Sequence, residues 1–392
     1  IMQHIKGGKE VIVTGAPIFD ADGEISMVVT NVRDITELNQ LRTQLEETRR
    51  LSSRYHQSIL EQEELEHFLG EMVVKSTSMV QVVRKAIKVA KVDASAAVIM
   101  SVNNSLVCAG MEKYCNEEQK MKYLVPLAKG EVIGAFCLSE PEAGSDATSQ
   151  KTTAIDMGDH YLLNGAKMWI TNAPLCDIAV VWAKGEDGKV RGMIVERGYE
   201  GFTTPETTNK WSLRASKTGE LVFNNVKVPK ENLLPNVEGL KGPLSCLNSA
   251  RYGISWGVIG AAIDCYCTAV QYSKERTQFG KPIASFQLQQ KKLAEFLTEI
   301  TKAQLLCWKL GTLKNDHKAT PAQISMAKRN NVRMAINVAR ESRQILGGMG
   351  IMGEFPMMRH AANLESVITY EGTEDVHLLI TGLDITGINA FS

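Results

Sequence analysis

The chain has 392 residues, of which 44% are hydrophobic, and it carries 44 basic and 44 acidic side chains. This length exceeds one typical hydrophobic core, so about two to four domains are expected. The balanced charge gives no electrostatic reason to expect a nucleic-acid or anionic-membrane partner. We also expect no membrane-spanning run and no signal peptide, and therefore a cytoplasmic protein.

The 8 cysteines are scattered along the chain. No cysteine or histidine pair has the spacing of zinc ligands, so the sequence predicts no metal site. Unpaired cysteines in this pattern are typical of a reducing compartment.

The N-terminal third predicts two strands and then helices. The strands flank a turn at Asp20–Gly23 within residues 9–33. A charged helix follows, in which Leu38, Leu41 and Leu45 recur every three to four residues. The repeat ends after Leu45, so a short coiled coil is the most that it predicts. Residues 71–93 and 94–130 predict further helices.

Strands are predicted for residues 131–228. In HYLLNGAKMWITNA, Asn164-Gly165 lies between apolar arms and predicts a hairpin turn. DIAVVWAKGEDGKVRGMIVERG predicts a second hairpin, and GELVFNNVKVP a further strand.

From about residue 240 the pattern is helical to the end. Thr320 and Gln323 make a capping box around Pro321, and the apolar stripe that follows ends at Gly347-Gly348. GMGIMG, residues 348–353, matches a dinucleotide-binding fingerprint, but it follows a helix rather than a strand, so we reject that site.

One acid near the C-terminus has no obvious structural role. In YEGTEDVHLLITGL, Thr373 predicts an N-cap, and Glu374 and Asp375 occupy the first helical turn, where acids suit the helix dipole. Glu371 lies outside this arrangement. Local pattern alone favours a solvated acid at the helix start over a catalytic base.

Three further segments each have a functional and an ordinary interpretation. FCLSEPEAGSDATS contains a proline bend and several hydroxyl side chains. Its hydroxyl and backbone N–H groups could bind a polar ring or a phosphate. The alternative interpretation is an ordinary turn. KMWITN places Trp169 and Thr171 on one face of a strand, where the tryptophan is a core residue or a cofactor platform. KERTQFGKPIASFQ flanks a glycine turn with Arg276 and Lys281, for phosphate or for solvent.

Taken in order, LSEPEAGSD, WITN, ERTQFGKPI, QILGGMG and YEGT resemble the acyl-CoA dehydrogenase family of flavoproteins, from about residue 94 to the C-terminus. KWSLRASKTGELVF, CLNSARYGISWGVIGA and ITGLDITGINAF are most similar to the glutaryl-CoA dehydrogenase branch. The resemblance implies an α+β fold with a central β-barrel-like domain and a C-terminal helical bundle. It also implies an FAD cofactor, an acyl-CoA substrate, electron transfer to an electron-transfer flavoprotein, and a homo-oligomer, expected to be a tetramer.

The resemblance assigns Glu371 as the catalytic base, and Ser101, Ser145 and Arg251 to the substrate side. Positions that contact the flavin within one subunit are Phe136, Leu138, Ser139, Gly144, Ser145, Trp169, Thr171, Thr373 and Asp375. Positions that reach the FAD of a neighbouring subunit are Arg276, Phe279, Gln344, Gly347 and Gly348.

The implied reaction explains these residue types. An α-proton of a thioester is too weakly acidic for a carboxylate in water, so the site must polarise the carbonyl and exclude water. An apolar pocket raises the pKa of a glutamate toward neutrality. Val367, Ile368 and Tyr370 provide suitable neighbours.

Two departures from the family pattern stand out. Glutaryl-type members carry an arginine four residues before the serine that aligns with Ser101, and this chain has Ala97 there. A short-chain, butyryl-type dehydrogenase is therefore the alternative.

The second departure is the N-terminus. GAPIFDADGEISMVVTNVRDITELNQLRTQLEE resembles the last strands and signalling helix of a PAS domain, and STSMVQVVRKAIKVAKVDAS the approach to the ATPase domain of enhancer-binding activators, although no Walker A loop follows. We expect a chimera in which this segment replaces the family's first helices; an inactive chimera is a further alternative. The expected division is 1–36 PAS-like strands, 37–93 signalling helix, 94–130 helical remnant, 131–232 β domain and 240–392 helical domain.

Overall fold

The computed structural model describes residues 2–5, 9–20, 22, 24–34, 36 and 94–391. The chain divides into two compact units, residues 1–80 and 81–392, which are described separately. The helices predicted for residues 37–93 lie outside the described residues.

The first unit contains a three-stranded antiparallel sheet in the order β1-β2-β3. Its strands are β1 (Met2–Ile5), β2 (Lys9–Phe19) and β3 (Ile25–Asp34). The carboxylate of Asp20 accepts hydrogen bonds from the backbone N–H groups of Asp22 (3.0 Å) and Glu24 (2.9 Å), which closes the β2–β3 turn. The two predicted strands and their turn are confirmed; β1 was not predicted.

The described part of the second unit begins with short helical segments, as predicted for residues 94–130. Asn116 and Gln119 form a capping box, and the left-handed Gly130 ends the last segment. The segments are α3 (Ala94–Ser101), the π-helix η1 (Val102–Cys108), α4 (Ala109–Tyr114), α5 (Glu117–Gln119), the π-helix η2 (Lys120–Leu124) and α6 (Val125–Lys129).

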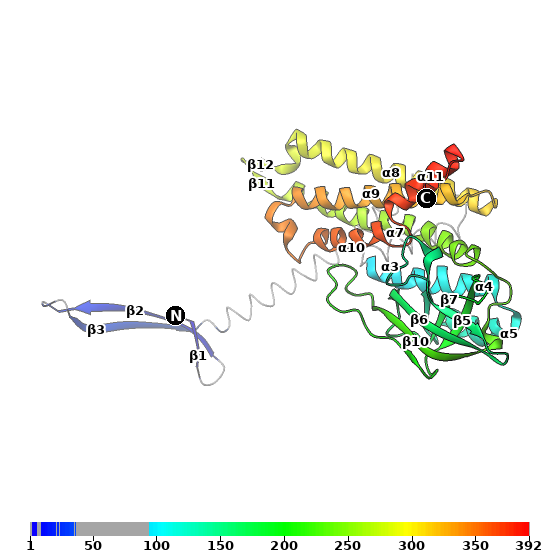
Figure 1. Ribbon diagram of the computed structural model, residues 1–392. Coiled ribbons are helices and arrows are strands. Elements are labelled where there is room, and N and C mark those ends of the chain that lie inside the picture. The colour runs from blue at the N-terminus through cyan, green and yellow to red at the C-terminus, as the bar shows by residue number, and fades with distance from the viewer. Residues whose placement is uncertain are drawn as a thin grey trace. The chain divides into compact units, whose positions relative to one another are not determined.

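A mixed seven-stranded sheet follows in the order β4-β7-β5-β6-β10-β9, with β8 paired to β7. The β4–β7 and β5–β7 pairs are parallel and the other pairs are antiparallel. The strands are β4 (Gly134–Cys137), β5 (Thr153–Asp156), β6 (His160–Thr171), β7 (Ile178–Lys184), β8 (Val190–Glu196), β9 (Phe202–Thr203) and β10 (Thr218–Pro229). This half-barrel is the expected central β domain, shown in green in Figure 1.

The hairpin predicted at Asn164-Gly165 is wrong. Strand β6 runs through both residues, with Asn164 opposite Thr153 of β5 and Gly165 opposite Phe223 of β10. Gly165 has φ +139°, and a Cβ there would lie 2.7 Å from the Cα of Thr152. The glycine therefore permits a close backbone approach in mid-strand and does not turn the chain.

Five helices form the C-terminal bundle predicted from residue 240 onward (Figure 1). They are α7 (Lys241–Glu275), α8 (Gln287–Asn315), α9 (Pro321–Ile345), α10 (Met357–Thr369) and α11 (Glu374–Thr386). The capping box of Thr320 and Gln323 is present at the start of α9. Buried Asn331 of α9 donates to the carbonyls of Ser255 (3.1 Å) and Ala303 (3.3 Å), tying α7 and α8 to α9.

The central helix α7 is long and apolar enough, by length and composition alone, to cross a membrane. We expected no such segment. Its most apolar stretch is 61% buried inside the protein, as in the central helix of a bundle. The hydropathy of α7 thus reflects packing against α8 and α9.

A hydrophobic core joins the first helices, the sheet and α7. Val107 and Met111 pack in one cluster with Phe136 of β4, Trp182 of β7 and Ala250 of α7. Each fully buried large side chain contributes about 1.5–3 kcal/mol through the hydrophobic effect. This packing sets α3 beside α7, where the candidate site lies.

Candidate active site

Glu371 lies in the turn between α10 and α11 with its backbone in the left-handed region. Its φ is +53°, and that of Gly372 is +96°. Such a conformation is uncommon for a residue with a side chain. It costs about 1–3 kcal/mol and persists only where the surroundings impose it.

The residues that follow Gly372 form the start of helix α11. Thr373 is the N-cap of α11, and its hydroxyl accepts a hydrogen bond from the Val376 N–H at 3.2 Å. Glu374, in the first turn, forms ion pairs with Arg329 (3.6 Å) and Arg333. Asp375 is exposed beside it.

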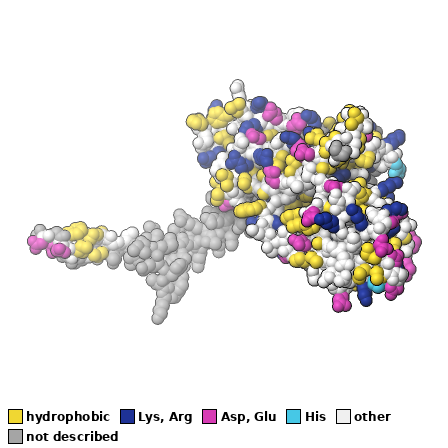
Figure 2. Space-filling view, in the orientation of Figure 1, with side chains coloured by type: hydrophobic (Ala, Val, Ile, Leu, Met, Phe, Trp, Pro, Cys, Tyr) yellow, Lys and Arg dark blue, Asp and Glu magenta, His cyan; other side chains and the backbone are white. Residues whose placement is uncertain are grey.

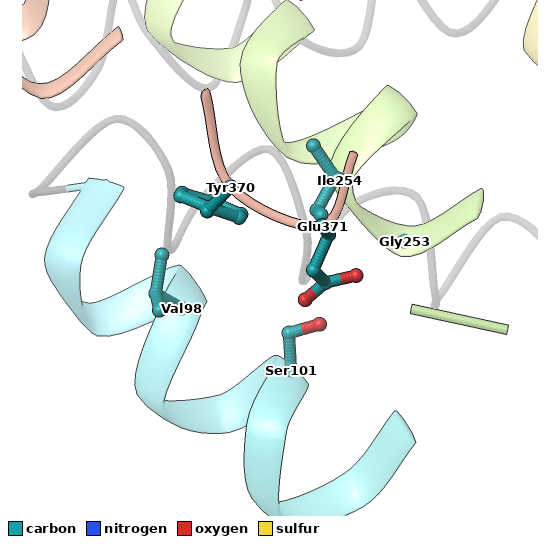
Figure 3. A pocket seen from close by; sticks show the side chains of 6 residues that line it. All are labelled: Val98, Ser101, Gly253, Ile254, Tyr370 and Glu371. Carbon is teal, nitrogen blue, oxygen red and sulfur yellow. The ribbon is translucent and has the colours of Figure 1, made fainter. Parts of the chain in front are cut away.

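The Glu371 carboxylate faces a cavity of about 40 Å³ between α3, α7 and the α10–α11 turn. Figure 3 shows the carboxylate pointing toward the hydroxyl of Ser101 at the end of α3. In the described part of the chain, neither Glu371 Oε2 nor Ser101 Oγ, both buried, has a hydrogen-bond partner. The remaining lining residues are Val98, Gly253, Ile254 and Tyr370.

Burial raises the pKa of Glu371 to about 7, because the carboxylate loses hydration in this cavity. The positive charges of Arg251 and Lys328 oppose the shift. Glu371 as a whole is half-buried, and its carboxylate oxygen Oε2 is sealed from solvent. The interpretation of Glu371 as a solvated acid is therefore wrong. A carboxylate with this pKa suits proton transfer near neutral pH.

Arg251 of α7 contacts the backbone of Glu371. Its Nε donates to the Glu371 carbonyl at 2.7 Å, and its Nη1 to Asn248 Oδ1 at 3.3 Å. The side chain is 6% exposed. The guanidinium thus holds the turn that carries the carboxylate.

Sequence reasoning missed two buried groups behind this turn. Lys328 of α9 donates to the carbonyls of Tyr370 and Gly372, and its burial lowers its pKa to about 7. The ring of His377 is buried, and its pKa is lowered to about 3, first by burial. A signal for Lys328 existed, because it lies one turn after Ile324 on the apolar stripe of α9.

The predicted flavin positions of the β domain come together at the end of β4 and on β6. Phe136 and Leu138 are buried, Ser139 is half-buried, and Gly144 and Ser145 are exposed in the loop that follows. The Met168 N–H donates to the Ser139 carbonyl at 2.9 Å, which joins this loop to β6.

Trp169 on β6 presents an aromatic face to solvent. It is 60% exposed, with φ +62°, so the core interpretation of this residue is wrong. Half-buried Thr171 lies two residues on. An exposed indole beside a hydroxyl-bearing loop with open space at Gly144 fits a planar, polar-edged ring such as a flavin.

A buried lysine anchors this loop and was also missed. Lys167 Nζ donates to the Leu138 carbonyl (3.0 Å), Glu140 Oε1 (2.8 Å) and Gln150 Oε1 (3.1 Å). Burial lowers the pKa of Lys167. Burial alone would raise the pKa of Glu140, but hydrogen bonds from the backbone of Lys151 and from the Lys167 side chain lower it overall.

The remaining predicted flavin positions lie at one end of the bundle. Arg276 and Phe279 belong to the hairpin of β11 (Thr277–Gln278) and β12 (Lys281–Pro282), and Phe279 at its tip is 92% exposed. Figure 1 shows this hairpin well away from β6. Exposed Gln344, Gly347 and Gly348 follow at the C-terminal end of α9, where Lys292 of α8 donates to Gln344 at 3.3 Å. The two predicted groups therefore lie in different parts of this subunit.

The half-barrel, the helical bundle, a glutamate with a buried carboxylate oxygen and an exposed tryptophan on β6 fit a flavin-dependent oxidoreductase. Three family descriptions match the chain: "Acyl-CoA dehydrogenase, N-terminal domain" over residues 68–131, the middle domain over 135–226, and the C-terminal domain over 238–384. The chain belongs to the acyl-CoA dehydrogenase family, and like that family it is an FAD-dependent enzyme. The match to the N-terminal domain starts at residue 68. The motifs had predicted that the resemblance starts later, at about residue 94.

Two curated relatives illustrate the similarity. The short-chain-specific acyl-CoA dehydrogenase of Megasphaera elsdenii is 39% identical over 302 residues, which is 75% of this chain and 79% of the relative. The acyl-CoA dehydrogenase of Bacillus subtilis is 37% identical over 306 residues, covering 76% of this chain and 80% of the relative.

Solved structures of the family share the fold. Glutaryl-CoA dehydrogenase from Mycobacterium smegmatis superposes with a TM-score of 0.78 at 45% identity, covering 80% of this chain and 81% of that one. Butyryl-CoA dehydrogenase from Megasphaera elsdenii gives 0.75 at 37% identity, covering 78% and 82%. A structure described as the electron transferring flavoprotein of Acidaminococcus fermentans gives 0.75 at 37%, covering 78% and 81%.

Proposed function

We propose that this chain catalyses the α,β-dehydrogenation of an acyl-CoA thioester with Glu371 as the catalytic base. The observation that carries the proposal is the buried, unpartnered carboxylate oxygen of Glu371 in a cavity lined largely by apolar groups. A buried carboxylate oxygen without a hydrogen-bond partner is energetically unfavourable, and acids perturbed in this way are concentrated at catalytic sites.

Glu371 would take the α-proton of the thioester, and the cavity would exclude the water that competes for its carboxylate. Among the residues that the structure describes, nothing accepts a hydrogen bond from the Glu371 backbone N–H. That N–H would donate to the thioester carbonyl and so acidify the α-carbon. FAD, when bound, supplies the acceptor for the hydride that leaves the β-carbon.

The flavin would be held by Trp169, Thr171 and the loop from Ser139 to Ser145 in one subunit. Thr373 and Asp375 would contribute from the start of α11. The group at the bundle end, from Arg276 to Gly348, would reach the FAD of a neighbouring subunit. This division implies a homo-oligomer, and we propose a tetramer.

Two acyl groups are candidates. Three motifs and the similarity to glutaryl-CoA dehydrogenase favour glutaryl-CoA, with decarboxylation to crotonyl-CoA. The lining of the cavity favours a straight short chain such as butyryl-CoA. No lysine or arginine is among the described residues that line it, and position 97 is alanine. A distal carboxylate buried without a cation is unfavourable.

We propose an electron-transfer flavoprotein as the electron acceptor. The division into PAS-like strands (1–36), signalling helix (37–93), helical remnant (94–130), β domain (131–232) and helical domain (240–392) remains a prediction. The rival reading, an inactive chimera, predicts a protein that purifies without FAD and is colourless.

An anaerobic assay across a panel of acyl-CoAs, with product masses determined, tests the proposal. We expect reduction of bound FAD by butyryl-CoA at least as fast as by glutaryl-CoA. A strong preference for glutaryl-CoA with release of carbon dioxide would show that a cation outside the cavity lining binds the distal carboxylate. Protein that holds FAD but is reduced by no acyl-CoA would contradict the proposed function.

A further inference from the structure

Three consecutive backbone carbonyls around Glu371 accept hydrogen bonds from two buried cations. Lys328 Nζ donates to the carbonyl of Tyr370 at 3.0 Å and to that of Gly372 at 2.9 Å. Arg251 Nε donates to the intervening carbonyl of Glu371 at 2.7 Å. The two side chains come from different helices, α9 and α7.

Burial of both cations is energetically unfavourable. Lys328 is 1% exposed and Arg251 is 6% exposed. In the described part of the chain, these two side chains donate to backbone carbonyls and to the amide oxygen of Asn248, and neither donates to a carboxylate. Buried Lys328 donates to the backbone carbonyls of a single turn. This pattern indicates that the lysine holds the conformation of that turn.

We propose that Lys328 is a positioning residue for the catalytic carboxylate: with Arg251 it holds the left-handed Glu371–Gly372 turn so that the Glu371 side chain enters the cavity. This inference rests on the proposed role of Glu371 as the base. The bonds on either side of Glu371 oppose relaxation of its φ of +53° toward the ordinary helical or extended regions. Misplacement of a reacting group by about 1 Å is enough to lower a rate about 100-fold.

The charge of Lys328 has a second effect on the same carboxylate. Besides Lys328, the charged or titratable groups that face Glu371 and this lysine are Arg251 of α7, Arg329 of α9, the Tyr370 hydroxyl, and Glu374 and His377 of α11. The cations Lys328 and Arg251 favour the ionised form of Glu371. Removing the lysine charge therefore shifts proton release from Glu371 to higher pH.

Lys328→Met and Lys328→Gln, prepared as FAD-loaded protein, test this inference. Anaerobic reduction of FAD by butyryl-CoA and by glutaryl-CoA is followed against pH, together with the dissociation constant of the acyl-CoA. We expect Lys328→Met to slow reduction by about 10- to 100-fold. The midpoint of its pH profile should rise by about half a unit or more. Acyl-CoA binding should be little changed.

Lys328→Gln separates the two effects. Its amide still donates to a carbonyl, so the loss of rate should be smaller, but the midpoint should rise as in Lys328→Met because the charge is gone. Lys318→Met, a change of an exposed lysine just before α9, should leave rate and midpoint at their parental values.

The outcomes are distinguishable from failure of the proposed function. If Glu371→Gln blocks reduction while both Lys328 variants keep the parental rate and midpoint, the positioning role is wrong and Glu371 remains the base. If Glu371→Gln itself reduces FAD normally, the proposed function is wrong. If both Lys328 variants fail to fold or to hold FAD, Lys328 is a residue of core stability and the inference is overturned.

Discussion

At the scale of single residues, the site depends on what surrounds one carboxylate. Glu371 and Glu374 are three residues apart, yet only Glu371 has a buried oxygen without a partner, while Glu374 lies between Arg329 and Arg333. The difference follows from the left-handed turn, which sends the Glu371 side chain inward toward α3. Environment, and not residue type, assigns the two acids different roles.

Glu371→Gln should abolish proton abstraction while the fold and the bound FAD persist. The amide keeps the shape of the side chain but does not accept the α-proton. Reduction of FAD by substrate in rapid-mixing experiments should fall by at least about 100- to 10,000-fold, and exchange of the α-proton with solvent should disappear.

Glu374→Gln is the matched control, because it should affect only the start of α11, by about 0.3–1 kcal/mol. If both Glu371→Gln and Glu374→Gln reduce FAD at the parental rate, Glu371 is not the catalytic base. Impairment of Glu374→Gln alone would mean that the wrong carboxylate was chosen.

The pKa of Glu371, raised to about 7, predicts the pH dependence of the parental enzyme. A base acts only when deprotonated, so the rate of FAD reduction should increase as the pH rises through about 7 and level off above it. An ordinary glutamate has a pKa of about 4.3 and would be fully deprotonated above pH 6. A rate of FAD reduction that is constant between about pH 5 and pH 8 would therefore contradict a buried base. Stopped-flow reduction at constant ionic strength measures this profile.

At the scale of elements, β6 joins Trp169 to the loop that follows β4. It carries Trp169 at its end, it is bonded to the loop after β4 through Met168, and it passes Thr152 closely at Gly165. The mid-strand glycine that resembled a hairpin turn is what allows this strand to continue to Trp169. The buried Lys167 then fixes the loop beside it.

Gly165→Ala should destabilise the protein by about 2–4 kcal/mol. The new Cβ would meet the backbone of Thr152, and the positive φ is unfavourable for alanine. Gly198→Ala is the control, since it lies exposed with open space around its Cβ position and should change stability by less than about 0.5 kcal/mol. Urea unfolding of both variants measures the difference; equal midpoints would refute the close-approach explanation.

At the scale of the second unit as a whole, one subunit carries two separated sets of predicted flavin contacts. Figure 2 shows hydrophobic side chains at the end of the bundle that bears β11 and β12; exposed examples there are Phe279, Leu288 and Ile351. An exposed aromatic at a hairpin tip suits contact with another molecule. These observations support an assembly in which subunits share the FAD.

Phe279→Ser should weaken FAD retention and shift the FAD-bound protein toward smaller species in sedimentation velocity. Trp211→Ser is the matched control, because Trp211 is also an exposed aromatic, at 90% against 92% for Phe279, but has no predicted flavin contact. FAD-bound parental protein that sediments as a monomer would defeat the shared-site prediction.

The sequence by itself determined the local elements: the β2–β3 turn at Asp20, the capping box at Thr320, the N-cap at Thr373, and the order of helices, half-barrel and bundle. These depend on interactions over a few residues, which composition and spacing express directly. The ordered motifs also determined the family.

Only the tertiary structure decided which of these residues are buried together. Arg251 and Glu371 are bonded although 120 residues separate them, and Lys328 reaches Gly372 across 44 residues. The same packing exposed Trp169, kept β6 continuous through Gly165 and placed the two predicted flavin groups apart. The pKa of Glu371 follows from desolvation by α3 and α7 and from charges on α7 and α9, so no local stretch of sequence contains it.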